Sequence, residues 1–118
     1  MVSDTISEAD EQRDARRAWV RLNNTRRDLL AAVGAFDTAP SGQEVKGIVQ
    51  SESGKEWPAS RLYPNLDELA DAGLLAKGHQ NKRTNEYALT TWGERVLNAG
   101  ADRLDEVRTT ARHTEGER

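Results

Sequence analysis

Hydrophobic positions recur mostly at helical spacing along this chain, and the clearest pattern spans Pro58 to Gly73. One face of that stretch is built from leucines at four- and three-residue steps, which predicts an amphipathic helix with a buried side: Leu62, Leu66 and Leu69. Gly73 stands where a left-handed residue commonly ends a helix. Pro58 suits the first helical position, whereas Pro64 lies further in and leaves a carbonyl near Ser60 without its backbone donor.

A first helix is predicted from about Ser7, because Ser7 and Asp10 match a capping box. Its apolar stripe is narrow, which favours packing on the domain or on a second copy of the chain: Ala15, Ala18, Trp19 and Leu22. Residues 1–11 are polar and rich in acids, so we expect them to form a mobile N-terminus.

Two more helices are predicted before the leucine-faced one. Thr25 and Asp28 predict the N-cap of a helix that runs to about Phe36. Ser41 and Glu44 match a second capping box and open the next helix. That helix, a short connection and the leucine-faced helix together predict a helix-turn-helix.

After Gly73 the pattern changes to that of a hairpin and then returns to helical spacing. Thr84 to Leu89 alternate as a half-buried strand does, and the polar residues Gln80 to Arg83 predict a hairpin tip. Thr91 with Glu94 predicts the cap of a last long helix. This helix carries a partial coiled-coil seam with a seven-residue repeat: Leu97, Leu104 and Ala111, with Gly100 and Val107 between them.

The order of elements predicts a mainly α fold with a small β-hairpin (α+β), as a winged helix-turn-helix with extra N-terminal and C-terminal helices. We expect the winged helix-turn-helix with its leading helix at residues 12–93, a C-terminal dimerisation helix at residues 91–113, and a tail at residues 114–118.

Composition limits the classes of function. A chain of 118 residues fits one domain, and the absence of cysteine excludes disulfides, thiolate metal sites and thiol-based redox sensing. No apolar run approaches the ~20 residues that span a membrane, and the N-terminus lacks a basic and apolar leader, so a cytoplasmic protein is expected. His79 and His113 lack metal-ligand spacing and no catalytic motif occurs, so we expect no metal, no cofactor and no enzymatic activity.

Charge is distributed unevenly. The net charge is −3, yet six arginines and one acid lie between Arg13 and Arg27, and three cations without an acid lie between Lys77 and Arg83. Such local fields outweigh the total charge when a polyanion binds. The arginine-rich and acid-rich composition indicates a salt-adapted source with acidic faces turned away from DNA; an ordinary acidic protein is the alternative.

The stretch from Ser60 to Leu75 reads S-R-L-Y-P-N-L-D-E-L-A-D-A-G-L-L, and it resembles the recognition-helix signature of PadR-like winged-helix transcription regulators. The similarity extends from about Ser41 to Gly93. Composition and flanks are most similar to small haloarchaeal members, such as a regulator of the reactive-oxygen-species response. The resemblance implies a homodimeric, sequence-specific regulator on a pseudo-palindromic operator, active in a stress response. Many members carry a larger C-terminal helical domain, so no separate ligand-sensing domain is expected in this short version.

Under this interpretation the leucine-faced helix enters a major groove. Arg61 and Asn65 are chemically able to read base edges there, while Ser60 and Tyr63 donate to phosphates. The other expected DNA contacts lie early in the preceding helix, at the hairpin tip, and at the start of an earlier helix: Gln43, Lys46, Asn81, Lys82, Arg83, Arg26 and Arg27. The hairpin tip would reach the adjacent minor groove or its phosphates. The expected partner is double-stranded DNA, with salt ions at the interface.

A homodimer is expected through the last helix, joined by the first, with contacts from Trp19, Leu22, Trp92, Val96, Leu97, Gly100, Leu104, Val107 and Ala111. Arg13, Arg17 and Arg21 share one face and fit either flanking phosphates or ion pairs across the dimer. Trp57 fits a staple for a helix start better than a lid over a small-molecule pocket. Two other functions stay open: a protein interaction module, favoured by the net charge, and a small-molecule-gated regulator that uses the dimer cleft.

Overall fold

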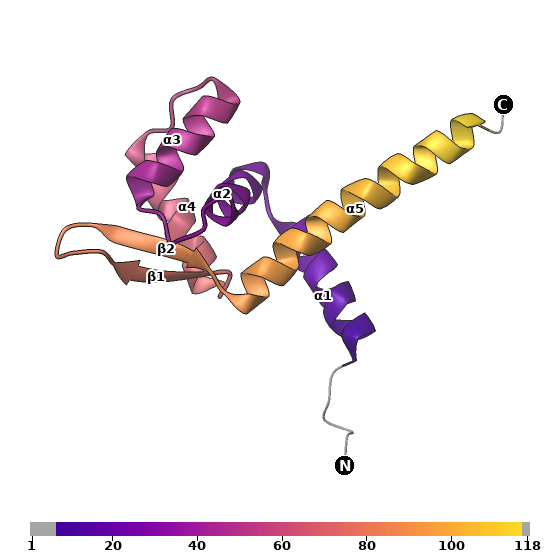
Figure 1. Ribbon diagram of the computed structural model, residues 1–118, viewed down its shortest axis with the longest axis horizontal. Helices are drawn as coiled ribbons and strands as arrows, with labels where there is room; N and C mark the ends of the chain where they lie inside the picture. The colour runs from indigo at the N-terminus through magenta and orange to yellow at the C-terminus, as the bar shows by residue number, and fades with distance from the viewer. Residues whose placement is uncertain (1–6, 117–118) are drawn as a thin grey trace, which may run out of the picture.

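The computed structural model describes residues 7–116, with side chains to residue 111, and contains five helices and one two-stranded antiparallel sheet (Figure 1). This is the fold class predicted from the sequence. The elements are α1 (Glu8–Arg21), α2 (Asn24–Gly34), α3 (Gly42–Ser53), α4 (Ala59–Asp71), β1 (Leu75–His79), β2 (Asn85–Leu89) and α5 (Thr91–Gly116).

Helix starts agree with the capping patterns in two cases and differ in two. Ser41 and Glu44 form the reciprocal capping box that the sequence predicts, and Ser7 caps α1. The cap of α2 is Asn23, because its side chain accepts from the backbone N–H of Arg26, so the prediction at Thr25 and Asp28 is wrong. The cap of α5 also precedes the predicted position, by one residue: the hydroxyl of Thr90 accepts from the backbone N–H of Gly93.

The outer bounds of α1 and α5 agree with the predicted start and extend past the predicted end. α1 begins at Glu8, as the helix predicted from about Ser7 requires, because Ser7 caps it and three acids fill its first turn; it therefore takes in part of the range 1–11 that was expected to be mobile. α5 continues to Gly116 rather than ending at residue 113. Residues 1–6 and 117–118 lie outside the described residues.

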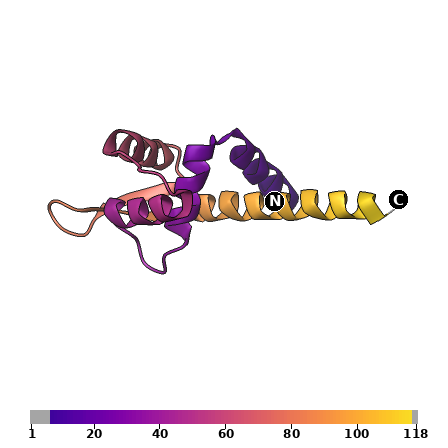
Figure 2. The ribbon, with the colours of Figure 1, turned by 90° about the horizontal axis from the view of Figure 1, so that it is seen from above.

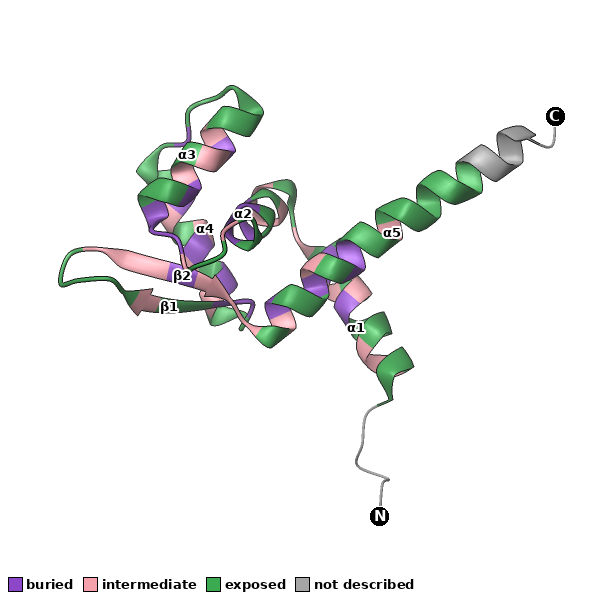
Figure 3. Cartoon of the chain, in the orientation of Figure 1, coloured by how far each residue is buried: buried purple, intermediate pink, exposed green. Residues whose placement is uncertain are grey.

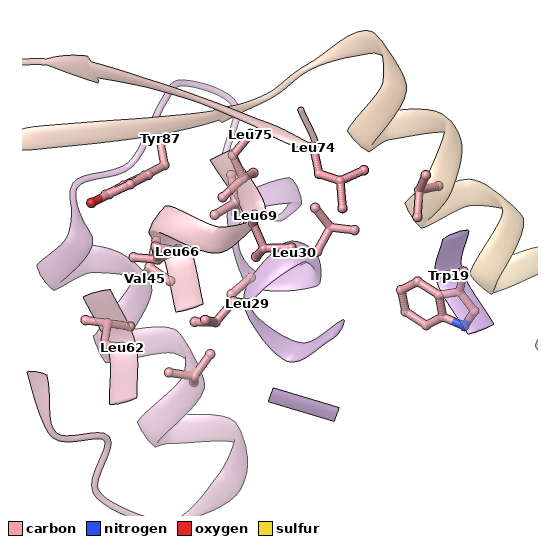
Figure 4. Packing of buried hydrophobic residues seen from close by; sticks show 14 of the residues in the cluster. Trp19, Leu29, Leu30, Val45, Leu62, Leu66, Leu69, Leu74, Leu75 and Tyr87 are labelled. Carbon is pink, nitrogen blue, oxygen red and sulfur yellow. The ribbon is translucent and has the colours of Figure 1, made fainter. Parts of the chain in front are cut away.

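The main core lies between α2, α4 and the sheet. Figure 4 shows the leucines of α4 facing those of α2, with Tyr87 covering them from the sheet side. Pro58 is the N-cap residue of α4 rather than its first helical residue. At the other end Gly73 adopts a left-handed conformation with φ of 78°, and the backbone N–H of Leu74 donates to the carbonyl of Leu69. α4 is therefore fixed at its end and along its buried face.

The hairpin is attached to the start of α3. β1 and β2 pair in the register Leu75↔Leu89 to His79↔Asn85. The backbone N–H of Tyr87 donates to the carbonyl of Pro40, and Ser41 forms a bridge with Glu86. Because these contacts join the sheet to the N-terminus of α3, the hairpin forms a wing beside the helix-turn-helix.

α1 and α5 form an arm on the side away from the wing (Figures 1 and 2). Trp19 of α1 is 8% exposed and packs over Gly100 of α5. Ion pairs join Glu11 with Arg95 and Arg16 with Glu106 along the same crossing. Beyond that crossing the described part of α5 is exposed almost all round (Figure 3). None of the described helices is long and apolar enough to cross a membrane.

Candidate nucleic-acid interface

The polar side of α4 divides into two electrostatic halves. Its first turns carry Ser60 and Arg61, both exposed, whereas its second half carries the acids Asp67, Glu68 and Asp71. Lys77 of β1 binds Asp67 at 3.0 Å, and this hydrogen bond raises the pKa of Lys77. A polyanion therefore finds favourable charge at the N-terminal half of α4, where the helix dipole is also positive.

Arg61 is held by two residues from outside α4. Its guanidinium lies over the Trp57 ring, with Cζ 4.0 Å from the ring centroid, and its Nη2 donates to Thr25 Oγ1 at 3.0 Å. Trp57 is 1% exposed and belongs to the core, so the interpretation of this tryptophan as a staple is confirmed. The guanidinium of Arg61 is thus exposed on one side and stacked on the buried Trp57 ring on the other, in a cation–π contact.

Asn65 lies one turn further along α4 and is also engaged. Its Nδ2 donates to the backbone carbonyl of Arg61 at 2.7 Å, and its Oδ1 accepts from Arg26 Nε at 3.3 Å. Arg26 also approaches Glu68 at 3.9 Å. The two residues predicted to read bases are therefore neighbours on one side of α4, each bound to the start of α2.

A hollow of about 320 Å³ separates the start of α3 from the wing. Gln43 and Tyr63 lie on its wall, where Gln43 Nε2 donates to Tyr63 Oη at 3.2 Å. Arg83 lines the same hollow from the wing. The structure therefore brings together three predicted phosphate contacts from three different elements, next to the N–H groups that begin α3.

The wing tip divides into a residue that shapes the turn and residues that project from it. Asn81 Oδ1 accepts from the backbone N–H groups of Arg83 and Thr84, so this side chain stabilises the turn. Lys82 and Arg83 are exposed, and within residues 7–111 their side-chain charges have no ion-pair partner. Lys46 of α3 is half-buried.

Arg27 does not fit the DNA-facing set. Its Nε donates to the carbonyl of Trp19 at 3.1 Å, its Nη2 donates to that of Val20 at 3.0 Å, and it lies over the Trp19 ring. These carbonyls end α1, and the Trp19 carbonyl also accepts from the backbone N–H of Leu22. Arg27 therefore adds side-chain donors to the C-terminal end of that helix and caps it. We therefore remove Arg27 from the expected DNA contacts.

The arginines of α1 are used in different ways. Arg13 pairs with Asp10 on the same helix, and Arg16 pairs with Glu106 of α5. Arg17 and Arg21 are exposed, and neither has an ion pair among the described side chains. The ion pairs of the α1 arginines are formed within the same chain. Arg17 and Arg21 are therefore able to bind a phosphate or an acidic group of a partner.

The residues predicted for the dimer interface separate into two groups. Trp19, Val96 and Gly100 are buried within the subunit, and Leu22, Trp92 and Leu97 pack against the same core. A second copy cannot reach the fully buried Val96, so its place is in the core. Leu104 is 59% exposed and Val107 is 55% exposed, with Ala111 exposed beside them. The free apolar surface is therefore the far part of the predicted seam.

Thr25 is the residue at this interface that sequence reasoning missed. It was assigned to a helix cap, and 36 positions separate it from Arg61, so no local spacing signals their contact. Within the described residues no group of three or more His, Cys, Asp or Glu side chains could hold a metal ion.

A family model described as the transcriptional regulator PadR-like family matches residues 34–99, more than half of the chain. The chain belongs to the PadR-like family. This confirms the resemblance drawn from Ser60 to Leu75, and the matched residues run from the end of α2 into α5. No curated protein matches this PadR-like chain.

Solved structures similar to this PadR-like chain include haloarchaeal regulators. The hsRosR-S4 complex is 31% identical, with a TM-score of 0.70, and the match covers 88% of this chain and 98% of that one. A structure of H. salinarum RosR, from a crystal grown from NaBr, is 30% identical with a TM-score of 0.64. That match covers 83% of this chain and 97% of the RosR chain. The S. aureus MepR-DNA complex has 17% identity and a TM-score of 0.63, covering 87% and 74%, which shows the fold alone.

Proposed function

We propose that this PadR-like regulator binds a pseudo-palindromic operator as a homodimer. α4 enters the major groove with its N-terminal half, and the wing reaches the backbone or the minor groove beside it. The observation that carries this proposal is the convergence of polar side chains from α3, α4 and the wing around the first turns of α4. Arg61 and Asn65 would contact base edges, and Ser60, Tyr63, Gln43 and Arg83 would contact phosphates.

The dimer would form through the exposed apolar residues of α5, and half-sites would lie one or two helical turns apart, at roughly 34 to 36 Å per turn. Residues 12–93 would then act as the DNA-binding unit and the rest of α5 as the dimerisation helix. Regulation would follow from blocking or recruiting other proteins at promoters, in the stress response that the resemblance of the Ser60 to Leu75 stretch implies.

Selection of bound duplexes from a random DNA pool at high KCl tests this function. We expect the purified protein to enrich an inverted repeat, because a two-fold dimer presents two identical reading helices. Sequencing of the bound pool gives the half-site and its spacing. No enrichment at any salt concentration, with a folded and dimeric protein, would contradict the proposal.

A triple variant separates DNA binding from a role as a protein interaction module. Arg61→Ala, Lys82→Ala and Arg83→Ala together should abolish retention on the enriched duplex, since they remove base and phosphate donors from exposed positions. A matched control removes exposed charge far from the interface: Arg108→Ala, whose partner is Asp105 on the same helix. Equal DNA retention by both variants would favour the interaction module.

A further inference from the structure

We infer that the first turn of α2 sets the DNA sequence preference by positioning the base-reading side chains of α4. This inference rests on the proposed DNA function. Two consecutive residues of α2 each bind one of the two side chains: Thr25 binds Arg61 and Arg26 binds Asn65. Both contacts run between helices that the fold packs side by side in its core.

The contacts of Arg61 fix both its plane and its direction. The Trp57 ring lies 4.0 Å from Cζ and supports the guanidinium from one face. Thr25 Oγ1 then accepts one N–H from Nη2 at 3.0 Å. A guanidinium has five N–H donors, so enough remain for a bidentate contact with one base. Thr25 therefore holds Arg61 in place without using the donors that read DNA.

The contacts of Asn65 fix the orientation of its amide. Arg26 Nε donates to Oδ1 at 3.3 Å, while Nδ2 donates to the Arg61 carbonyl at 2.7 Å. An amide that reads adenine must present one donor and one acceptor on the correct sides. Oδ1 can accept a second hydrogen bond and Nδ2 carries a second N–H. Arg26 therefore selects which side of the amide donates.

Positioning of this kind acts on affinity through entropy. Ordering one free side chain at an interface reduces affinity roughly twofold to tenfold, and a side chain that is already ordered avoids most of that loss. α2 itself carries no residue expected to touch a base. Thr25 and Arg26 are thus positioning residues, and they would alter base preference from outside the groove-facing helix.

Thr25→Val tests the first contact, because valine keeps the β-branched shape and removes the acceptor. Binding constants would be measured for the enriched operator and for duplexes substituted at each half-site position. We expect Thr25→Val to reduce discrimination about fivefold at the position where Arg61→Ala reduces it, as loss of one hydrogen bond does. Thr25→Ser keeps the hydroxyl and should restore the preference of the wild type.

The same substitution in the Arg61→Ala background separates positioning from a general structural role. Once Arg61 is absent, Thr25→Val should change neither the preference nor the affinity any further. Equal losses in both backgrounds, or a loss spread evenly over all duplexes, would overturn the inference. The inference would also be overturned if Thr25→Val kept full discrimination between duplexes at the half-site position where Arg61→Ala loses it. If the wild type enriches no duplex, the proposed function fails and the inference with it.

Arg26 offers an independent pair of variants. Arg26→Met keeps the aliphatic stem and removes the donor to Asn65, whereas Arg26→Gln keeps an N–H donor while also losing the charge. We expect Arg26→Met to reduce discrimination at the base position that Asn65→Ala identifies, and Arg26→Gln to retain most of it. Equal and sequence-independent losses in the two variants would indicate a phosphate contact instead and overturn this part of the inference.

Discussion

The hydroxyl of Tyr87 is buried without a hydrogen-bond partner among the described residues. The residue is 0% exposed, and burial raises the pKa of its phenol above the ordinary value of 10.0. A buried hydroxyl without a partner costs free energy, so Tyr87→Phe should leave the free energy of unfolding at pH 7 unchanged or raise it by up to about 1 kcal/mol. Urea denaturation of both proteins measures this difference.

The same variant should alter the pH dependence of stability. Because the pKa of Tyr87 is higher in the folded state, its phenol ionises first in the unfolded chain as the pH rises above 10.0. The wild type therefore loses stability between the unfolded and the folded pKa, and Tyr87→Phe lacks this loss. A loss of more than about 1 kcal/mol at pH 7 would show that the hydroxyl is hydrogen-bonded. An unchanged profile above pH 10 would contradict the raised pKa of Tyr87.

Single residues also show where prediction from sequence ends. Arg26 and Arg27 are adjacent, and both were predicted to contact phosphates. Arg27 caps α1 instead, since the carbonyls of Trp19 and Val20 end that helix beside it. Composition and local charge identify a basic cluster, but the tertiary structure decides which guanidinium has a free face. The contact of Arg61 with Thr25 could not be predicted from the sequence either, because it depends on how α2 crosses α4.

The start of α5 passes directly over the connection between α4 and β1, and a glycine makes this approach feasible. A Cβ at Gly93 would lie 2.0 Å from the Leu74 carbonyl oxygen, and the backbone there cannot move freely. Gly93→Ala should therefore reduce the free energy of unfolding by about 1–3 kcal/mol or more. The midpoint of urea denaturation reports the change.

Gly47 provides a matched control for that substitution. It lies within α3, is exposed, and has nothing within 4 Å of the position of an added Cβ. Gly47→Ala should stabilise the protein by roughly 0.5–1 kcal/mol, because alanine loses less conformational freedom in a helix than glycine does. Similar effects of the two substitutions would contradict the close approach at Gly93.

Elements with a complete local signal were predicted best. α4 combines a leucine face with the Gly73 ending, and the structure confirms both. The caps at Asn23 and Thr90 were displaced from the predicted positions, because several polar residues at each site can accept from the first N–H groups. The core position of Val96 was also missed, since an apolar seam alone does not show which part the subunit covers itself.

At the scale of the whole molecule, the apolar residues of α5 beyond its crossing with α1 have no cover within the described chain. Leu104→Asp should weaken the proposed dimer and leave the subunit folded, because this side chain is 59% exposed. Affinity for the inverted repeat should fall with the loss of the second reading helix. Light scattering measures the mass, and Thr109→Asp, exposed on the same helix, is the control. A Leu104→Asp variant that remains dimeric would place the interface elsewhere.

Few cations at the proposed interface are without an ion-pair partner among the described side chains, which predicts a shallow dependence of DNA affinity on KCl. Lys82 projects from the wing tip, so Lys82→Ala should reduce the slope of log K against log [KCl] by about 1 per subunit. It should weaken binding evenly across sequences, since a phosphate contact carries no base information. Arg61→Ala is the comparison, because it should alter the base preference. A change of preference in Lys82→Ala would instead assign the wing to readout of bases in the minor groove.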